Sequence, residues 1–206
     1  MSITTILIIV TVAISLYAWQ SPAVLDKLML RPTKITDQKE YFRFITSGFV
    51  HADYWHLGFN MLSLYGMGVA VEASFINIFG DSGKYYYLAL YILGIIVSDL
   101  PTYFKNKNNS FYASLGASGG VSSVVFAAIM VAPLSSICLY FAICIPAFIF
   151  GGLYVMYSYY EAKRGGGRIN HDAHLYGALF GIVFMVVVLP QVVPYFFEQI
   201  KTYRLF

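Results

Sequence analysis

The stretch FYASLGASGGVSSVVFAAIMVAPLSSICLYFAICIPAFIFGGLYVMYSYY, residues 111–160, holds no charged residue. As one straight helix it would reach about 75 Å, more than twice the bilayer core of about 30 Å. The stretch must therefore fold back on itself, and residues 132–136 are the expected turn because Pro133 interrupts helices. Two spanning helices, near 114–132 and 134–159, are predicted from it.

The rest of the chain has the composition of an integral membrane protein. Of its 206 residues 59% are hydrophobic and only 11% are charged, against about 25% in soluble domains. No Lys/Arg-rich block predicts a nucleic-acid partner, so the expected partner surface is the lipid bilayer. We predict an all-α, polytopic single domain over residues 1–206. Its six helices are expected near 3–19, 55–73, 84–100, 114–132, 134–159 and 172–189.

Two local features bear on processing and redox chemistry. No Lys or Arg precedes residues 3–19, so this segment lacks the basic start of a cleaved signal peptide and is predicted to be a retained helix, with a cleaved signal as the alternative. Cys138 and Cys144 stand six residues apart in the helix predicted over 134–159. Residues so spaced on a helix face different directions, so we predict no disulfide bond between them and an inert packing role.

A serine set among glycines opens the uncharged stretch, in the octapeptide Leu-Gly-Ala-Ser-Gly-Gly-Val-Ser of residues 115–122. Glycine lets a backbone approach another group closely and leaves N–H groups free to face a ligand. Ser118, at a helix start, can therefore serve as a nucleophile with backbone donors beside it. Packing is the alternative, because Gly116 and Gly120 form a GxxxG pair of the kind that joins membrane helices.

Polar residues in two other predicted helices point to the same layer of the membrane. Asn60 lies near the start of the second helix, and His174 lies near the start of the sixth. Gly177 and Gly181 share one face of the sixth helix with His174. Helices two, four and six run in one direction, so Asn60, Ser118 and His174 gather near one membrane face. Buried polar groups in membrane helices are costly and are candidates for function. The alternatives are an interhelical hydrogen bond for Asn60 and a capped, packed histidine at 174.

These residue types support acyl-transfer chemistry. His174 can take the proton of Ser118 Oγ and later give it to a leaving amine. The backbone N–H of Ser118 and the amide of Asn60 could hold an oxyanion, and His56, on the same helix face as Asn60, could add a donor. Other polar residues near the spans are expected to be structural. They are His51, Glu72, Asp99 and His171.

The ordered set of motifs resembles that of the rhomboid intramembrane serine proteases. Residues 116–119, Gly-Ala-Ser-Gly, match the GxSG nucleophile motif of that family. Residues 174–181, HLYGALFG, match its HxxGxxxG motif, and residues 56–60, HLGFN, match its HxxxN element. Residues 42–51 resemble the first-loop signature, with Phe42 in the usual tryptophan place.

The resemblance implies a six-transmembrane-helix rhomboid-like bundle with a Ser118–His174 catalytic dyad. It also implies that Asn60 and His56 assist the oxyanion site, and that no metal or organic cofactor takes part. The implied substrates are transmembrane segments of other membrane proteins, and the expected location is a multi-pass position in the bacterial plasma membrane. One departure is Ser122, because many bacterial members carry there a tyrosine stacked on the catalytic imidazole.

Three other functions are alternatives to proteolysis. The first is an inactive rhomboid-like protein that binds membrane clients, although such relatives usually lack the serine or the histidine. The second is a transporter or channel, which calls for charged residues deep in spans or for paired broken helices, and the sequence shows neither. The third is a metalloprotease, but residues 171–174, His-Asp-Ala-His, lack the glutamate of an HExxH motif.

Membrane orientation is predicted differently by charge and by resemblance. The first, third and fifth loops hold ten of the 13 Lys and Arg residues, and the positive-inside tendency would place them in the cytoplasm. The resemblance implies the reverse, with a cytoplasmic N-terminus and a site that opens outward. We adopt the family orientation as the expectation, because an embedded first loop and helix packing can override loop charge.

Overall fold

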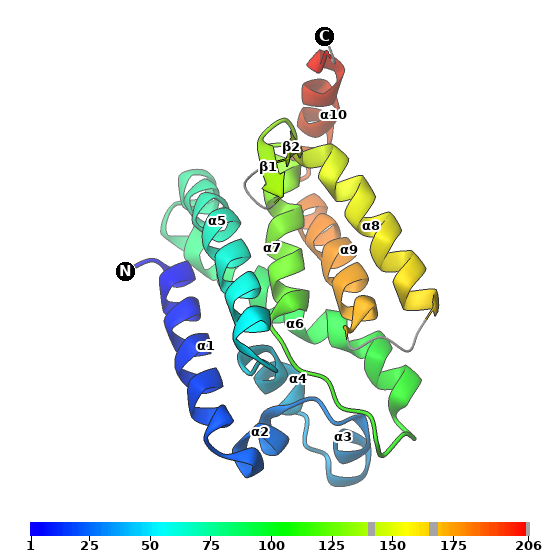
Figure 1. The fold of residues 1–206 in the computed structure, drawn as a ribbon. Coiled ribbons are helices and arrows are strands. Elements are labelled where there is room, and N and C mark those ends of the chain that lie inside the picture. Colours follow the sequence, from blue (N-terminus) through cyan, green and yellow to red (C-terminus); the bar gives the residue numbers. More distant parts are fainter. Residues whose placement is uncertain (140–142, 165–168, 205–206) are drawn as a thin grey trace.

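The computed structural model describes residues 1–139, 143–164 and 169–204, which form a bundle of helices with one small hairpin (Figure 1). The elements in chain order are α1 (Ile3–Trp19), α2 (Pro22–Leu28), α3 (Pro32–Gln38), α4 (Arg43–Thr46), η1 (Ser47–Phe49), α5 (Tyr54–Phe79), η2 (Gly80–Ser82), α6 (Gly83–Asn106), α7 (Ser118–Val131), β1 (Ser136–Leu139), β2 (Ile143–Pro146), α8 (Ala147–Arg164), α9 (His171–Val188) and α10 (Val192–Thr202).

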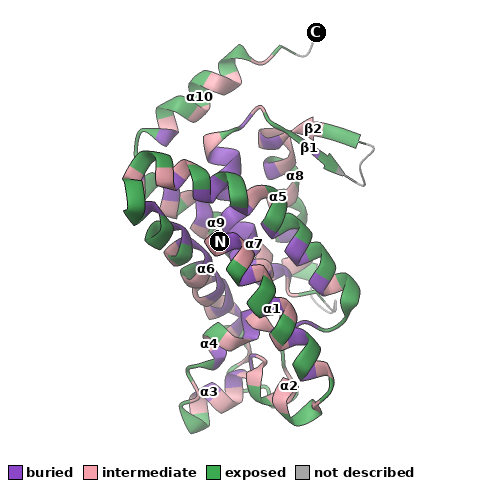
Figure 2. Cartoon of the chain, turned by 90° about the vertical axis from the view of Figure 1, so that its left-hand side faces the viewer, coloured by how far each residue is buried: buried purple, intermediate pink, exposed green. Residues whose placement is uncertain are grey.

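Helix α7 is the centre of the bundle. It packs mainly against α5, α6 and α9, and it also contacts α8 and α10. Nearly all of its residues are buried, as the colouring in Figure 2 shows. A helix that is apolar on every side can be buried on every side, which is the case here because the sequence from 118 to 131 holds no charged residue. The helix that begins at Ser118 is therefore fixed by neighbours all around it.

The contact between α7 and α9 is made by small residues. We call these residues the α7–α9 seam: Gly119, Ser123, Gly177 and Gly181. A Cβ at Gly177 would overlap the backbone of Gly119, and a Cβ at Gly181 would overlap the backbone of Ser123. Ser123 Oγ lies 2.9 Å from the carbonyl oxygens of both Gly119 and Gly177. Both helices advance by four residues between the two contacts, so they run parallel with their backbones pressed together.

A buried carboxylate ties α1 to α5. Glu72, which is 3% exposed, accepts hydrogen bonds from the backbone N–H groups of Ile3 and Thr4 and from the Thr4 hydroxyl, at 2.7–2.9 Å. The first N–H groups of a helix have no partner within the helix, and a carboxylate also suits its positive end. Glu72 thus has the structural, hydrogen-bonded role that the sequence predicted for it.

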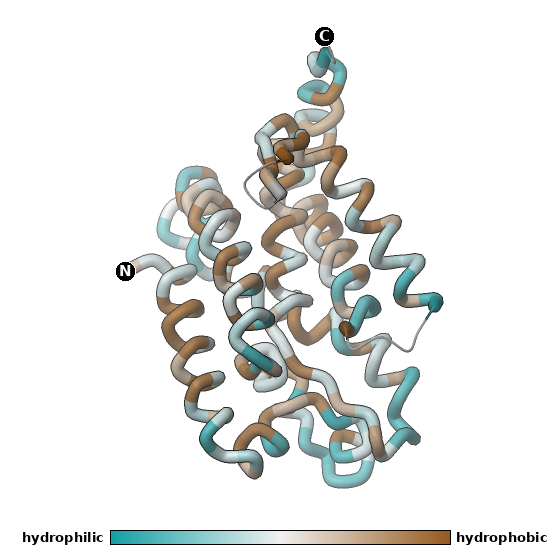
Figure 3. The backbone as a smooth tube through the Cα atoms, viewed as in Figure 1, coloured by the Kyte–Doolittle hydropathy of each residue, from teal (hydrophilic) through white to brown (hydrophobic). Residues whose placement is uncertain are grey.

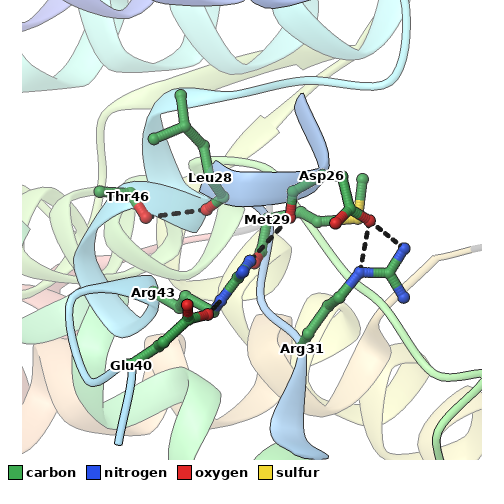
Figure 4. A network of polar contacts seen from close by, with 7 residues as sticks. All are labelled: Asp26, Leu28, Met29, Arg31, Glu40, Arg43 and Thr46. Atoms are coloured by element: carbon green, nitrogen blue, oxygen red, sulfur yellow. Dashed lines mark hydrogen bonds and ion pairs between the residues drawn. The ribbon is translucent and has the colours of Figure 1, made fainter. Parts of the chain in front are cut away.

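The first loop is a folded unit built around one arginine (Figure 4). Arg43 is 3% exposed, and its Nη1 donates to the carbonyl oxygens of Asp26 and Met29 at 2.7 and 2.8 Å. Its Nε donates to Glu40 Oε2 at 2.6 Å. The planar guanidinium reaches several acceptors at once, which a lysine could not do. The loop therefore holds α2, α3 and α4 in fixed positions at one end of the bundle.

The prediction of one helix over 134–159 is wrong. Residues 136–139 and 143–146 form the antiparallel strands β1 and β2, and the helix α8 begins only at Ala147, while residues 140–142 lie outside the described residues. The prediction of unpaired cysteines is wrong for the same reason. Cys138 and Cys144 are directly opposed in the strand register and form a disulfide bond. The spacing of six separates two residues on a helix but makes them cross-strand neighbours in a short hairpin.

The helix predicted over 3–19 is present with the same ends, and the remaining predicted helices are present with shifted ends. The helices predicted over 55–73 and 84–100 extend to Phe79 and Asn106, and the one predicted from 114 begins at Ser118. Within the described residues, two helical segments are long and apolar enough to cross a membrane, namely Tyr54–Asn106 and His171–Val188, while α1 and α7 are apolar but shorter. Figure 3 shows the hydropathy along these helices. The count of six spanning helices stays a prediction.

Candidate active site

The segment before Ser118 has a backbone conformation that requires glycine. Gly116 has φ +123°, in the left-handed region, and a Cβ at this position would overlap the imidazole of His56. Its N–H donates to the carbonyl of Ser47 at 2.9 Å. Leu30 and Ser114 exchange two further backbone hydrogen bonds, at 2.8 and 3.1 Å. The first loop therefore fixes the chain just before the serine.

His51 holds the next residue of this segment. Its Nε2 accepts the N–H of Ala117 at 3.2 Å, and its Nδ1 lies 3.1 Å from Ser15 Oγ. Burial, together with the charge of His56, lowers the pKa of His51 to about 3. The imidazole is therefore neutral near pH 7, with Nε2 as acceptor and the proton on Nδ1 facing Ser15. This agrees with the structural role predicted for His51.

Ser118 and His174 lie at about the same height in the bundle. Gly177 faces Gly119 across the seam, Ser118 precedes Gly119 by one residue, and His174 precedes Gly177 by three. At about 1.5 Å per residue, the two Cα atoms differ in height by about 3 Å. Both residues are half-buried, so neither is sealed from the surface. The packing thus places the two residues predicted as nucleophile and base at similar heights on neighbouring helices.

No hydrogen bond joins Ser118 and His174 among the described residues, and the His174 side chain makes none to any other of them. Catalytic hydrogen bonds are often long without substrate and shorten in the complex. Aromatic contacts hold the His174 ring instead. Tyr154 stacks on it, with ring centroids 6.1 Å apart and an interplanar angle of 16°. His171 meets its edge at 5.7 Å.

The hydroxyl of Tyr154 is hydrogen-bonded to the hydroxyl of Ser122, the position where the sequence departs from the family pattern. Tyr154 Oη and Ser122 Oγ are 2.7 Å apart. An aromatic ring thus lies on the imidazole after all, but it comes from α8 rather than from α7. The sequence does not predict this contact, because α8 carries tyrosines at 154, 157, 159 and 160 and nothing in the sequence distinguishes the first.

The residues predicted to assist the oxyanion lie on α5. Asn60 is 7% exposed, and its Nδ2 donates to the carbonyl of His56 at 2.9 Å, which leaves one N–H of the amide for another acceptor. The His56 ring lies against Gly116 and is edge-on to His51 at 4.9 Å. His56 therefore borders the serine segment, whereas the Asn60 amide is engaged within its own helix.

A small polar cavity lies behind Ser118. Its volume is about 10 Å³, and Ser47, Ser98, Asp99 and Asn170 supply polar groups to its wall. A space of this size holds about one water molecule. Asp99 accepts a hydrogen bond from Ser47 Oγ at 3.0 Å, as expected of a hydrogen-bonded rather than a catalytic carboxylate. Across the described residues, no group of three or more His, Cys, Asp and Glu is arranged to hold a metal ion.

A helical protein with these apolar helices, and with a serine and a histidine at one end of a glycine-packed helix pair, has the features of an intramembrane protein of the rhomboid type. The family model for the rhomboid domain matches residues 38–191, which is well over half of the chain. The chain belongs to the rhomboid family, and the family is one of membrane proteins.

Three relatives are similar to this chain at 27–29% identity, and all are mitochondrial. RHOMBOID-like protein 12 of Arabidopsis thaliana is 27% identical over 65% of this chain and 42% of its own length. Rhomboid protein 1 of Saccharomyces cerevisiae is 29% identical over 81% and 47%. The presenilin-associated rhomboid-like protein of Mus musculus is 27% identical over 68% and 36%. The chain thus spans less than half the length of each relative.

Proposed function

We propose that the protein is an intramembrane serine endopeptidase in which Ser118 is the nucleophile and His174 the general base. The observation that carries the proposal is the α7–α9 seam, which supports a meeting of the two side chains at one height while both stay partly exposed. Neither residue type is reactive enough alone, and a base beside the hydroxyl is what makes serine a nucleophile.

The proposed reaction has two halves. Ser118 Oγ attacks the carbonyl carbon of the scissile peptide and passes its proton to His174, which then protonates the leaving amine. The resulting ester is hydrolysed by water that gives its proton to His174, and the Ser118 hydroxyl is restored. The Ser118 N–H, at the positive end of α7, and the free N–H of Asn60 are the proposed oxyanion donors, with His56 beside them.

The proposed substrates are transmembrane segments of other membrane proteins, reached from the surrounding lipid. Both residues of the dyad lie at helix ends near the first loop, so cleavage is expected near one membrane face rather than at mid-depth. The bacterial plasma membrane stays our prediction for the compartment, although the three relatives above are mitochondrial.

An inactive protein that binds membrane clients is the second candidate, favoured by the missing hydrogen bond between Ser118 and His174. Cleavage of a fluorogenic transmembrane reporter by purified protein in vesicles discriminates the two. Wild type should cleave it and Ser118→Ala should not, while Ser63→Ala, an exposed serine on α5, should act as wild type. A wild-type protein that binds the reporter but leaves it intact would favour the second candidate.

A further inference from the structure

His174 lacks the orienting partner that a catalytic histidine usually has. Among the described residues no carboxylate or carbonyl hydrogen-bonds its ring, so its orientation depends on ring contacts. A general base works only when one nitrogen points at the proton that it removes, and errors of about 1 Å can cost about 100-fold in rate. The stacked ring of Tyr154 is the contact that defines the plane of the imidazole.

Tyr154 is itself held on three sides. Its ring packs on Phe126 of α7 with centroids 5.6 Å apart and on Phe150 of α8 at 5.8 Å. Its hydroxyl is fixed by Ser122 at 2.7 Å. A ring with two aromatic neighbours and a bound hydroxyl has little freedom to tilt. Two of these three groups, Phe126 and Ser122, lie on α7, so the ring is held in place by the same helix that carries Ser118.

We infer that Tyr154 is a positioning residue for His174 and that the Ser122 hydroxyl fixes Tyr154 in place. This inference rests on the proposed function. It also explains how the chain does without a tyrosine at position 122, because a tyrosine on α8 stacks on the imidazole and the serine at 122 becomes its hydrogen-bond partner.

The test compares Tyr154→Leu with Tyr160→Leu, a matched change at an exposed tyrosine of the same helix. With the transmembrane reporter, Tyr154→Leu should lower kcat about 10- to 100-fold and leave KM within about twofold, because substrate binding does not need an aligned base. Tyr160→Leu should leave both constants unchanged. A Tyr154→Leu enzyme with wild-type kcat would overturn the inference.

The conservative variants keep the test decisive if Tyr154→Leu does not fold. Tyr154→Phe retains the ring and should lose only about threefold in kcat, the value of one hydrogen bond. Ser122→Ala removes the same hydrogen bond from the other side, so it should lose as much, and the double variant should lose no more. Additive losses in the double variant would contradict the proposed link between the two residues.

A spectroscopic readout separates this inference from the proposed function. The ring-proton NMR resonances of His174, assigned by their loss in His174→Gln, should shift in Tyr154→Leu and stay in Tyr160→Leu, because a stacked ring changes the local magnetic field. A shift in a protein without activity would uphold the contact and reject the proteolytic function. Unshifted resonances would reject the positioning role even in an active enzyme.

A second inference concerns membrane orientation and has independent support. The end of the bundle with Ser118 carries the first and third loops and the end of α8, which together hold nine of the 12 Lys and Arg residues that the structure describes. The opposite end carries the hairpin with the disulfide bond between Cys138 and Cys144, close to α10 (Figure 1). Basic loops favour the cytoplasmic side, and disulfide bonds persist in oxidising compartments.

The geometry points to a protein whose Ser118 end faces the cytoplasm and whose hairpin and C-terminus lie outside. This is the reverse of the orientation that the family resemblance implied, and it would release the cut domain of a substrate on the cytoplasmic side. Two C-terminal fusions in a bacterial host test it. An alkaline phosphatase, active only outside, should be active, and a fluorescent protein that matures only inside should stay dark. The opposite pair of signals would overturn the inference.

Discussion

The two ends of helix α7 are held in different ways. At the Ser118 end, the backbone is bound by Ser47 and His51, which lie about 70 residues earlier in the chain. At the other end, after Val131, the contacts are local: Ala147 bonds to Ser135, and Phe148 bonds to Pro133. The end proposed for catalysis is therefore determined by many distant segments, as an exact arrangement of reacting groups requires. At the other end the backbone hydrogen bonds come from the chain next to it, and α10 adds side-chain packing.

The largest effect is expected from the base itself. His174→Ala should lower reporter cleavage by about 10³-fold or more, since general base catalysis contributes about 10²- to 10⁴-fold. The protein should still insert and unfold at nearly the same temperature, because the imidazole makes no hydrogen bond to another described residue. Ser63→Ala, at an exposed serine of α5, is the control and should retain full activity. Equal losses in the two variants would show that the loss in His174→Ala does not come from the base.

The next effect is expected in the α7–α9 seam. Gly177→Leu should separate the two helices at the height of the dyad, because even a Cβ there overlaps the backbone of Gly119. We expect a loss of stability of about 1–3 kcal/mol and no detectable cleavage. Gly152→Leu is the matched control, since a Cβ at Gly152 has no neighbour within 4 Å. Thermal unfolding in detergent measures both, and an active, stable Gly177→Leu protein would contradict the seam.

A smaller effect is expected in the first loop. Arg43→Ala leaves the carbonyl oxygens of Asp26 and Met29 without their donor, which should cost about 1–3 kcal/mol of folding free energy and part of the activity. Arg31→Ala breaks a partly exposed ion pair with Asp26 and should cost under about 1 kcal/mol. Urea unfolding in mild detergent compares the two. Similar losses would mean that the buried arginine does not organise the loop.

The smallest effect is expected at the hairpin. Replacing Cys138 and Cys144 together by serine removes the disulfide bond far from the dyad, so cleavage should stay within about twofold of wild type. The chain-entropy argument gives so short a loop about 2 kcal/mol, confined to the hairpin. A loss of activity like that of Arg43→Ala would show that the two ends of α7 are coupled.

The residues of the proposed dyad could be predicted from the sequence because each is part of a motif with its own spacing. The apolar helices could be predicted from hydropathy, although Pro101 did not end α6 as a proline often does. The hairpin could not be predicted from the sequence, because an uncharged apolar stretch is typical of a buried helix as well as of a buried strand. Pro133 and Pro146 were the available signal, because they leave too few residues between them to cross a bilayer.

The contacts that complete the site were harder to predict. Tyr154 is one of four tyrosines on α8, and which of them meets His174 depends on how that helix is rotated against α9. The sequence predicts a structural role for His51, but the hydrogen bond from Ala117 N–H to His51 depends on how the first loop folds over the segment before Ser118. Such contacts join segments distant in the chain, and one sequence carries no periodicity that reveals them.

The most direct measurement of the central claim is covalent modification by a fluorophosphonate, with the modified residue mapped by mass spectrometry. The reagent reacts only with a serine hydroxyl that a nearby base has activated. We expect wild-type protein in detergent to be modified at Ser118 alone, and His174→Ala to be modified at least about 100-fold more slowly. An unmodified Ser118 in folded wild-type protein, or an equal rate without His174, would contradict the proposed dyad.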